Sequence, residues 1–240
     1  MSRPGAAGTA AAANGTYHRS AAEQAAQGDA FRANNGNYYR NYGNVDAYAG
    51  YANAWRPNAV VAGSFYTHPG YGALATGLGM AAVATPYNYG TNVVTQPSTV
   101  YVNGDAAASP QDYASQATQI AATGQTAQPA DDTKWLPLGV FAMVEGDAKN
   151  SDDVFQLAVD KEGIIRGNYH NVKTDDVETV TGSVDKQSQR AAWTIGSDKF
   201  PVYEAGISNL TKAQTPVLVH TEDGGANQVS LIRLEEPPQQ

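Results

Sequence analysis

The chain has 240 residues, a formal net charge of −8 and no cysteine, so disulfides, thiolate metal sites and cysteine nucleophiles are excluded. Residues 1–130 carry five arginines and five carboxylates, so residues 131–240 hold the whole negative excess. Nucleic acids and anionic membrane surfaces both require basic groups on the protein, and this charge distribution predicts neither of them as a partner.

Residues 1–86 form a low-complexity arm that is rich in Ala, Gly, Asn and Tyr. Few of these side chains are large and aliphatic, so their burial would not offset the loss of chain entropy, and we expect the arm to be mostly disordered. Its spaced tyrosines leave two alternatives, a flexible tether and a sticky arm that promotes assembly. The stretch 57–104 contains no Asp, Glu, Lys or Arg, and an uncharged stretch of this length is expected to pack or to associate.

No targeting segment and no transmembrane segment are predicted. The opening residues, MSRPGAAGTAAAANG, lack the compact apolar core of a secretory signal. The longest apolar run, residues 73–85, is too short and too rich in Gly and Ala to cross a bilayer.

Residues 87–130 are expected to contain a β-hairpin, a short helix and a linker. Two β-prone runs lie within 91–105, with turn residues at 96–98 and at Asn103-Gly104. The predicted helix spans 109–124, with Ser109 as its N-cap and Gly124 at its end. Its apolar face is too narrow to stabilise an isolated helix, so we expect the helix to dock on the following domain. That face consists of Tyr113, Ala117, Ile120 and Ala121.

Residues 131–236 alternate between apolar and polar side chains with a period of two, which predicts an all-β domain. Eight short strands with short connections indicate an antiparallel meander, either a small up-and-down barrel or a two-sheet sandwich. Inward-facing Gly167 and Gly182 favour the barrel, because a closing sheet bends sharply. The repeat Val-Asp-Lys at 159–161 and 184–186 falls at two hairpin turns and is interpreted as turn chemistry.

The first strand of this domain, 135–144, is apolar on both of its faces. A strand with this pattern is covered on both sides. We expect the domain core to cover one face and the helix at 109–124 to cover the other.

The inward-facing side chains of the predicted strands are bulky enough to fill a small barrel, although an eight-stranded barrel can also hold one small ligand. A solid core is the simpler interpretation, and a modest ligand pocket is the alternative. For that alternative, the speculative ligand-binding residues are Phe155, Tyr169 and Trp193.

No catalytic residue, cofactor or metal site is predicted. The strand pattern places His170 and His220 on the outward face near strand ends, as solvated surface side chains. The sequence contains no nucleophile elbow, phosphate-binding loop or histidine-rich metal spacing. The acidic loop 147–153 offers oxygen ligands for Ca²⁺ but lacks the Gly and the distal Glu of a calcium loop, so it is interpreted as a solvated turn.

Six stretches within residues 87–235 resemble a family of uncharacterised planctomycete bacterial proteins, some labelled mu-protocadherin or putative cell-surface protein. These stretches are YGTNVVTQPSTVYVNG, YASQATQIAATG, WLPLGVFAM, FQLAVDKEGIIRGNY, GSVDKQSQRAAWTIG and GISNLTKAQTPVLVH. The resemblance implies an envelope-associated protein, in the periplasm or at the cell surface, with a low-complexity arm and a β domain. It brings no catalytic residues with it.

We therefore expect a non-enzymatic structural or interaction protein of the cell envelope, with protein partners or self-association through the arm. The alternative is a carrier of a small molecule or lipid inside the barrel. An enzyme ranks third, and it would require His170 or His220 to converge with a buried carboxylate.

Overall fold

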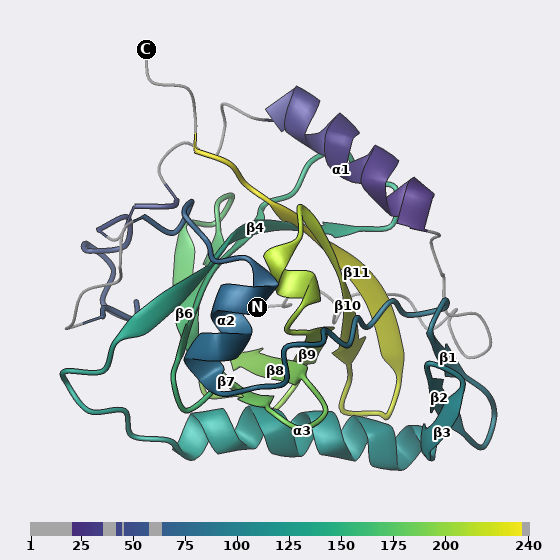
Figure 1. Cartoon of the computed structure of the whole chain (residues 1–240). Helices are drawn as coiled ribbons and strands as arrows, with labels where there is room; N and C mark the ends of the chain where they lie inside the picture. Colours follow the sequence, from purple (N-terminus) through teal and green to yellow (C-terminus); the bar gives the residue numbers. More distant parts are fainter. Residues whose placement is uncertain (1–20, 36–41, 45, 58–63, 237–240) are drawn as a thin grey trace.

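The computed structural model describes residues 21–35, 42–44, 46–57 and 64–236. Its centre is a closed barrel of eight antiparallel strands in the order β10-β11-β4-β5-β6-β7-β8-β9 (Figure 1). The strands are β4 (Trp135–Glu145), β5 (Asp153–Asp160), β6 (Ile164–Asn171), β7 (Asp176–Asp185), β8 (Arg190–Ile195), β9 (Val202–Gly206), β10 (Gln214–His220) and β11 (Ala226–Arg233). The predicted all-β meander is therefore confirmed as a barrel, which closes where β11 pairs with β4.

Local turn chemistry joins successive strands, as the repeated Val-Asp-Lys predicted. After β5, the Asp160 carboxylate accepts hydrogen bonds from the backbone N–H groups of Glu162 and Ile164 at 2.9 and 2.8 Å. After β7, the Asp185 carboxylate accepts from both the backbone N–H and the hydroxyl of Ser188. These bonds fix the turns, and with them the register of the strands on either side.

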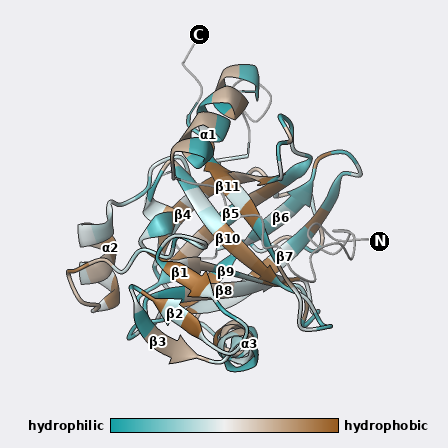
Figure 2. Cartoon of the chain, turned by 90° about the vertical axis from the view of Figure 1, so that its right-hand side faces the viewer, coloured by the Kyte–Doolittle hydropathy of each residue, from teal (hydrophilic) through white to brown (hydrophobic). Residues whose placement is uncertain are grey.

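The barrel interior is filled by side chains that alternate with outward-facing ones along each strand. The hydropathy colours likewise change along the barrel strands (Figure 2). Gly167 and Gly182 allow a close approach of the neighbouring backbone, because a Cβ atom at either position would collide with the adjacent strand. The 3₁₀ turn η1 (Asn209–Thr211) contributes Leu210 to the same core.

A bulge in β4 changes which of its residues face inward. The pairing with β5 shifts between Pro137 and Gly139, and Gly139 has a φ of 139°, a conformation that favours glycine. Strict alternation would place Leu138 and Val140 on one face. Instead, Leu138 belongs to the interior cluster and Val140 to the outer one.

Helix α2 (Tyr71–Leu78) closes one end of the barrel. Leu74 and Leu78 are buried in the same cluster as the interior side chains, and Leu136 packs against that cluster at its edge. Figure 1 shows α2 in front of the barrel opening. The helix ends at Gly79, whose φ of 65° allows its N–H to cap the last turn.

Helix α3 (Pro110–Thr126) docks on the barrel, but not on the strand that we expected. It lies along β7, β8 and β9, where Ala117 and Ala121 pack against Ala192 and Val202. Its small side chains fit the small outward residues of these strands, whereas the outer face of β4 carries larger side chains that this helix face does not match. The helix also continues past Gly124, so that glycine does not end it. Ser109 is the N-cap, as predicted, with its hydroxyl accepting from the Asp112 N–H at 3.1 Å.

The outer face of β4 is covered by aromatic side chains from the arm. Phe31 of α1 (Ala21–Asn35) and Phe65 are fully buried there, together with Val140, Ala142 and Val144. Trp55 packs against the same cluster and meets the Trp135 ring edge-on, with ring centroids 5.1 Å apart.

The arm, residues 1–86, is expected to be mostly disordered, and those of its segments that the structure describes pack against the barrel. A few large aromatic side chains, among them Phe31, Tyr48 and Phe65, bury enough surface to hold these segments on the barrel. The remainder of that prediction lies outside the described residues.

A three-stranded sheet precedes α3, with strands β1 (Val93–Thr95), β2 (Val100–Val102) and β3 (Asp105–Ala108). The first hairpin was predicted, and the Asn103-Gly104 turn forms a second one, with φ values of 55° and 91°. Within the described part of the chain, no helix is long and apolar enough to cross a membrane.

Candidate functional site

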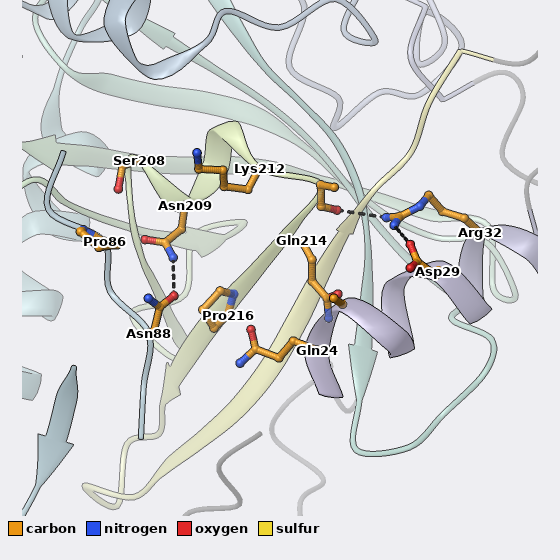
Figure 3. A pocket seen from close by; sticks show the side chains of 12 residues that line it. Gln24, Asp29, Arg32, Pro86, Asn88, Ser208, Asn209, Lys212, Gln214 and Pro216 are labelled. Atoms are coloured by element: carbon orange, nitrogen blue, oxygen red, sulfur yellow. Dashed lines mark hydrogen bonds and ion pairs between the residues drawn. The ribbon is translucent and has the colours of Figure 1, made fainter. Parts of the chain in front are cut away.

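A cleft of about 430 Å³ separates α1 from the barrel, and we call it the α1 cleft (Figure 3). One wall comes from α1, the other from residues 86–88 and η1, and the floor from the start of β10. Side chains with amide, hydroxyl or charged groups alternate with proline and alanine around it. The lining residues are Gln24, Ala25, Asp29, Arg32, Pro86, Asn88, Ser208, Asn209, Lys212, Ala213, Gln214 and Pro216.

Hydrogen bonds to backbone carbonyl groups hold the α1 wall in place. Gln27 donates to the Gly146 oxygen at 2.7 Å, and Asn35 donates to the Lys149 oxygen at 2.8 Å. Arg32 donates to the Ala213 oxygen at 3.3 Å and pairs with Asp29 at 2.6 Å, as Figure 3 shows. The three bonds to backbone carbonyl oxygens each span more than a hundred residues of sequence, so α1 is positioned by the barrel loops.

The opposite wall is more rigid, because its amide groups are already engaged. The Asn209 side chain accepts from the Tyr87 backbone N–H at 2.8 Å and donates to the Asn88 side chain at 3.1 Å. The Ser208 hydroxyl donates to the Thr85 oxygen at 3.1 Å. Residues 85–88 are thus fastened to η1, and this wall keeps a fixed shape.

The α1 cleft is suited to hydrogen bonding with a polar partner. Its lining contains neither histidine nor tyrosine, and its carboxylate, Asp29, is exposed and paired with Arg32. Lys212 adds an exposed ammonium group at the edge. Amides that both donate and accept match the N–H and C=O groups of a polypeptide.

The three residues considered as ligand-binding, Phe155, Tyr169 and Trp193, lie together inside the barrel. The Phe155 ring is 5.3 Å from that of Tyr169 and 6.3 Å from that of Trp193. All three side chains are buried. Tyr203, which was not among the predicted residues, stacks on Trp193 with the ring centroids 6.1 Å apart. Its inward direction could have been predicted from the alternation of inward and outward side chains along residues 200–204. The rings therefore contact one another, and none of the three lines the α1 cleft.

The prediction that His170 and His220 are solvated is wrong for both residues. Each does lie on an outward face, but His170 is only 5 % exposed and His220 only 3 %. The His170 ring is enclosed by Tyr42, Tyr48 and Tyr51 of the arm. Strand alternation gives the direction of a side chain but not what later covers it.

His220 belongs to a buried polar network centred on Glu204, which is completely inaccessible to solvent. Its carboxylate accepts from Arg190 Nε at 2.9 Å and from Tyr113 at 2.9 Å, and it lies 2.7 Å from His220 Nε2. Tyr89 donates to it as well, at 3.2 Å. Burial alone would raise the pKa of Glu204, but the Arg190 guanidinium and the His220 hydrogen bond lower it to about 2.

This network brings a histidine and a buried carboxylate together, the arrangement that an enzyme would have required. However, Glu204 already interacts with four side chains, and neither Glu204 nor His220 lines the α1 cleft. Two of the four partners, Tyr89 and Tyr113, come from the segment before the barrel. The network therefore fastens that segment to β8, β9 and β10.

The lowered pKa of Glu204 predicts a specific loss of stability in acid. The pKa is about 2 in the folded protein and 4.5 for an unperturbed glutamate, so the stabilisation is complete above pH 4.5. It is lost as the pH falls from 4.5 to 2, by about 3 kcal/mol in total. Urea unfolding of the native protein and of Glu204→Gln should show a stability difference that shrinks over this range. A difference independent of pH would contradict the prediction.

Asp153, at the end of the acidic loop 147–153, is engaged with the barrel. Its carboxylate accepts hydrogen bonds from the Tyr169 hydroxyl at 2.6 Å and from Asn171 at 2.9 Å. Burial raises the pKa of Asp153, and these two bonds oppose that shift. The searched residues, those that the structure describes, contain no group of three or more His, Cys, Asp or Glu side chains arranged for a metal ion.

Comparisons of the chain with known protein families, curated proteins and solved structures found no match.

Proposed function

We propose that the protein is a non-enzymatic structural or interaction protein of the cell envelope, which associates through the α1 cleft. The barrel acts as a rigid scaffold, and the arm supplies part of the binding surface. The envelope location rests on the resemblance of residues 87–235 to the planctomycete family described above.

One observation carries this proposal: the barrel interior is occupied by the protein's own side chains, whereas the α1 cleft is open. Phe155, Tyr169, Trp193 and Tyr203 contact one another in the interior, and Leu74 and Leu78 of α2 join the same core. A carrier needs free volume where these rings lie. A surface cleft of about 430 Å³ lies instead between the arm and the barrel.

The chemistry of the α1 cleft supports a polypeptide as its partner. Gln214 lines the cleft, and its side-chain oxygen is buried without a hydrogen-bond partner among the described residues. The arm of a second copy is rich in Asn, Gln and Tyr side chains that also donate and accept. The proposed partner is therefore the arm of a second copy of this chain, so the full-length protein should self-associate.

The test is sedimentation velocity of the full-length protein, with a substitution that fills the α1 cleft. Ala25→Arg places a long side chain into the cleft from an exposed position on α1, and we expect it to weaken self-association at least tenfold. Ala26→Arg adds the same charge at the next exposed position of the helix, which does not line the cleft. This control should associate like the native protein.

Native mass spectrometry of the protein purified from its own host distinguishes self-association through the α1 cleft from the alternative, a carrier with a ligand inside the barrel. A multimer without an adduct, dissociated by Ala25→Arg, supports the proposal. A monomer that releases a small molecule on denaturation, in both variants alike, would overturn it in favour of a ligand inside the barrel.

A further inference from the structure

A second, smaller cleft lies on the opposite side of β4 from the interior, where arm residues 55–57 face residues 129–131. Its volume is about 110 Å³, and its walls include two tryptophans and two arginines. We call it the Trp/Arg cleft, defined by Trp55, Arg56, Trp135 and Arg166. It shares no lining residue with the α1 cleft.

Arg166 is the unusual member of the Trp/Arg cleft. It points outward from β6 but is only 8 % exposed. One N–H donates to the Ile165 oxygen and another to the Ala127 oxygen, both at 2.9 Å. A guanidinium has five N–H donors, so three remain without a protein acceptor among the described residues.

The charge of Arg166 is only partly compensated. The Ala127 carbonyl stands at the C-terminus of α3, where the helix dipole supplies partial negative charge. Asp160 is the nearby carboxylate, but it is engaged by backbone N–H groups in its own turn and forms no ion pair with Arg166 within the described chain. Burial lowers the pKa of Arg166, and Asp160 opposes that shift. A buried cation that forms no direct ion pair is costly, so an anion bound beside it would be stabilising.

The other charged side chains in the lining of the Trp/Arg cleft are Arg56 and Asp131. Arg56 is exposed at the rim and donates to the Tyr51 oxygen at 3.0 Å. Asp131, also on the rim, contributes a carboxylate. Two guanidinium groups therefore face one carboxylate around the opening.

The walls of the Trp/Arg cleft are held rigidly. The Trp55 backbone N–H donates to the Asn168 side chain at 2.7 Å, and the same side chain donates back to the Trp55 oxygen at 3.2 Å. The Trp55 ring then meets the Trp135 ring at 77°. Such a pair of hydrogen bonds fixes the arm where it passes the guanidinium of Arg166.

We propose that the Trp/Arg cleft binds a small carboxylate anion. Arg166 donates two parallel hydrogen bonds to the two carboxylate oxygens, a geometry that the guanidinium fork favours. The tryptophan rings flank the carbon atoms of the ligand. A volume of 110 Å³ equals about four water molecules of liquid, which is enough for a carboxylate group and a short chain.

The three tryptophans of the chain provide a direct test. Their indole N–H groups give three signals in a ¹H–¹⁵N correlation spectrum, which Trp55→Phe and Trp135→Phe assign. Titration of the full-length protein with acetate, at constant ionic strength maintained with chloride, should move the signals of Trp55 and Trp135 and leave that of Trp193 in place. No movement, equal movement of all three signals, or the same response to chloride would overturn the proposal.

Variants of the two arginines identify the binding group. We expect Arg166→Gln to weaken acetate binding about 10- to 100-fold, since a hydrogen bond to a charged group contributes about 1.5–3 kcal/mol. Lys199→Gln removes an exposed cation that lines neither cleft and should leave acetate binding unchanged. If Arg166→Gln does not fold, because Arg166 also binds the end of α3, Arg56→Gln should still weaken binding several-fold. Unchanged affinity in the folded variant of either Trp/Arg-cleft arginine would overturn the assignment.

Two further probes distinguish the sources of the carboxylate. The first probe, N-acetyl-glycyl-glycine, presents the carboxylate of a peptide C-terminus. The second probe is the same dipeptide with its C-terminus amidated, which removes the negative charge. Binding of the free acid more tightly than acetate indicates a polypeptide C-terminus, and equal binding indicates a free small acid. Binding of the amide as tightly as the acid would overturn the proposal, because recognition would then not involve the carboxylate.

Discussion

Replacing Glu204 with glutamine should lower the free energy of unfolding by about 3–5 kcal/mol, the usual range when one partner of a buried ion pair is removed. The substitution preserves the shape of the side chain but leaves the Arg190 guanidinium, 4 % exposed, without a counterion. Arg190 would keep its bonds to Gln116 and to the Tyr113 oxygen, but these neutral acceptors do not balance its charge. Urea unfolding at neutral pH measures the loss.

The matched control is Asp29→Asn, which removes the carboxylate from an ion pair with Arg32 that is largely solvated, with Asp29 76 % exposed. Exposed pairs of this kind contribute less than about 1 kcal/mol, so the control should unfold nearly like the native protein. Equal, small effects of the two substitutions would contradict the prediction and show that water reaches Arg190.

Gly124→Ala should destabilise the protein by about 2–3 kcal/mol, although alanine is the better helix former. A Cβ atom at this position would overlap the backbone carbonyl of Gly182 on β7, and neither backbone can rotate away as a side chain would. Helix α3 would have to move off the barrel, so the overpacking strain should exceed the gain of about 1 kcal/mol in helix propensity. Differential scanning calorimetry should show a melting temperature lower by about 4–12 °C.

Gly72→Ala is the matched control for that substitution, because Gly72 also lies within a helix but nothing approaches its Cβ position within 4 Å. There the helix propensity should dominate, and the protein should gain about 0.5–1 kcal/mol. If Gly124→Ala also stabilised the protein, the close approach of α3 to β7 would be wrong.

The barrel could be predicted from the sequence because its causes are local. Period-two alternation places Phe155, Tyr169 and Trp193 on the inside, and turn residues such as Asp160 and Asp185 define the hairpins. Each strand pairs with its neighbour in sequence, so little more than the pattern is needed until β11 closes on β4.

The coverings of the barrel could not be predicted in the same way, because they depend on contacts between residues far apart in sequence. Phe31 and Phe65 are isolated aromatic residues in a polar arm, and nothing near them in sequence shows that the outer face of β4 will bury them. Gly124 resembled the end of a helix, although it serves as the contact with Gly182. The wrong prediction for His170 and His220 has the same cause, since segments that precede the barrel in sequence help to bury both side chains.

The clefts were beyond prediction for the same reason. The α1 cleft exists only because α1 lies beside β10 and faces η1, and the Trp/Arg cleft only because Trp55 lies against Trp135. A partial signal for the second cleft was Arg166, a charged residue in the middle of a strand whose neighbours are apolar or small. A central arginine of this kind indicates that something covers the strand.

The segments that cover the barrel precede it in sequence, and this order has a consequence for folding during synthesis. Every described segment that wraps the barrel, from α1 to α3, leaves the ribosome before the first barrel strand, yet α3 docks on β7 to β9 and α1 lies beside β10 and β11. These segments must therefore wait, unattached, while about a hundred further residues are made. Their scarcity of large aliphatic side chains suits that interval, since a nascent segment with little to bury has little reason to collapse on itself or on a neighbour before the barrel is complete.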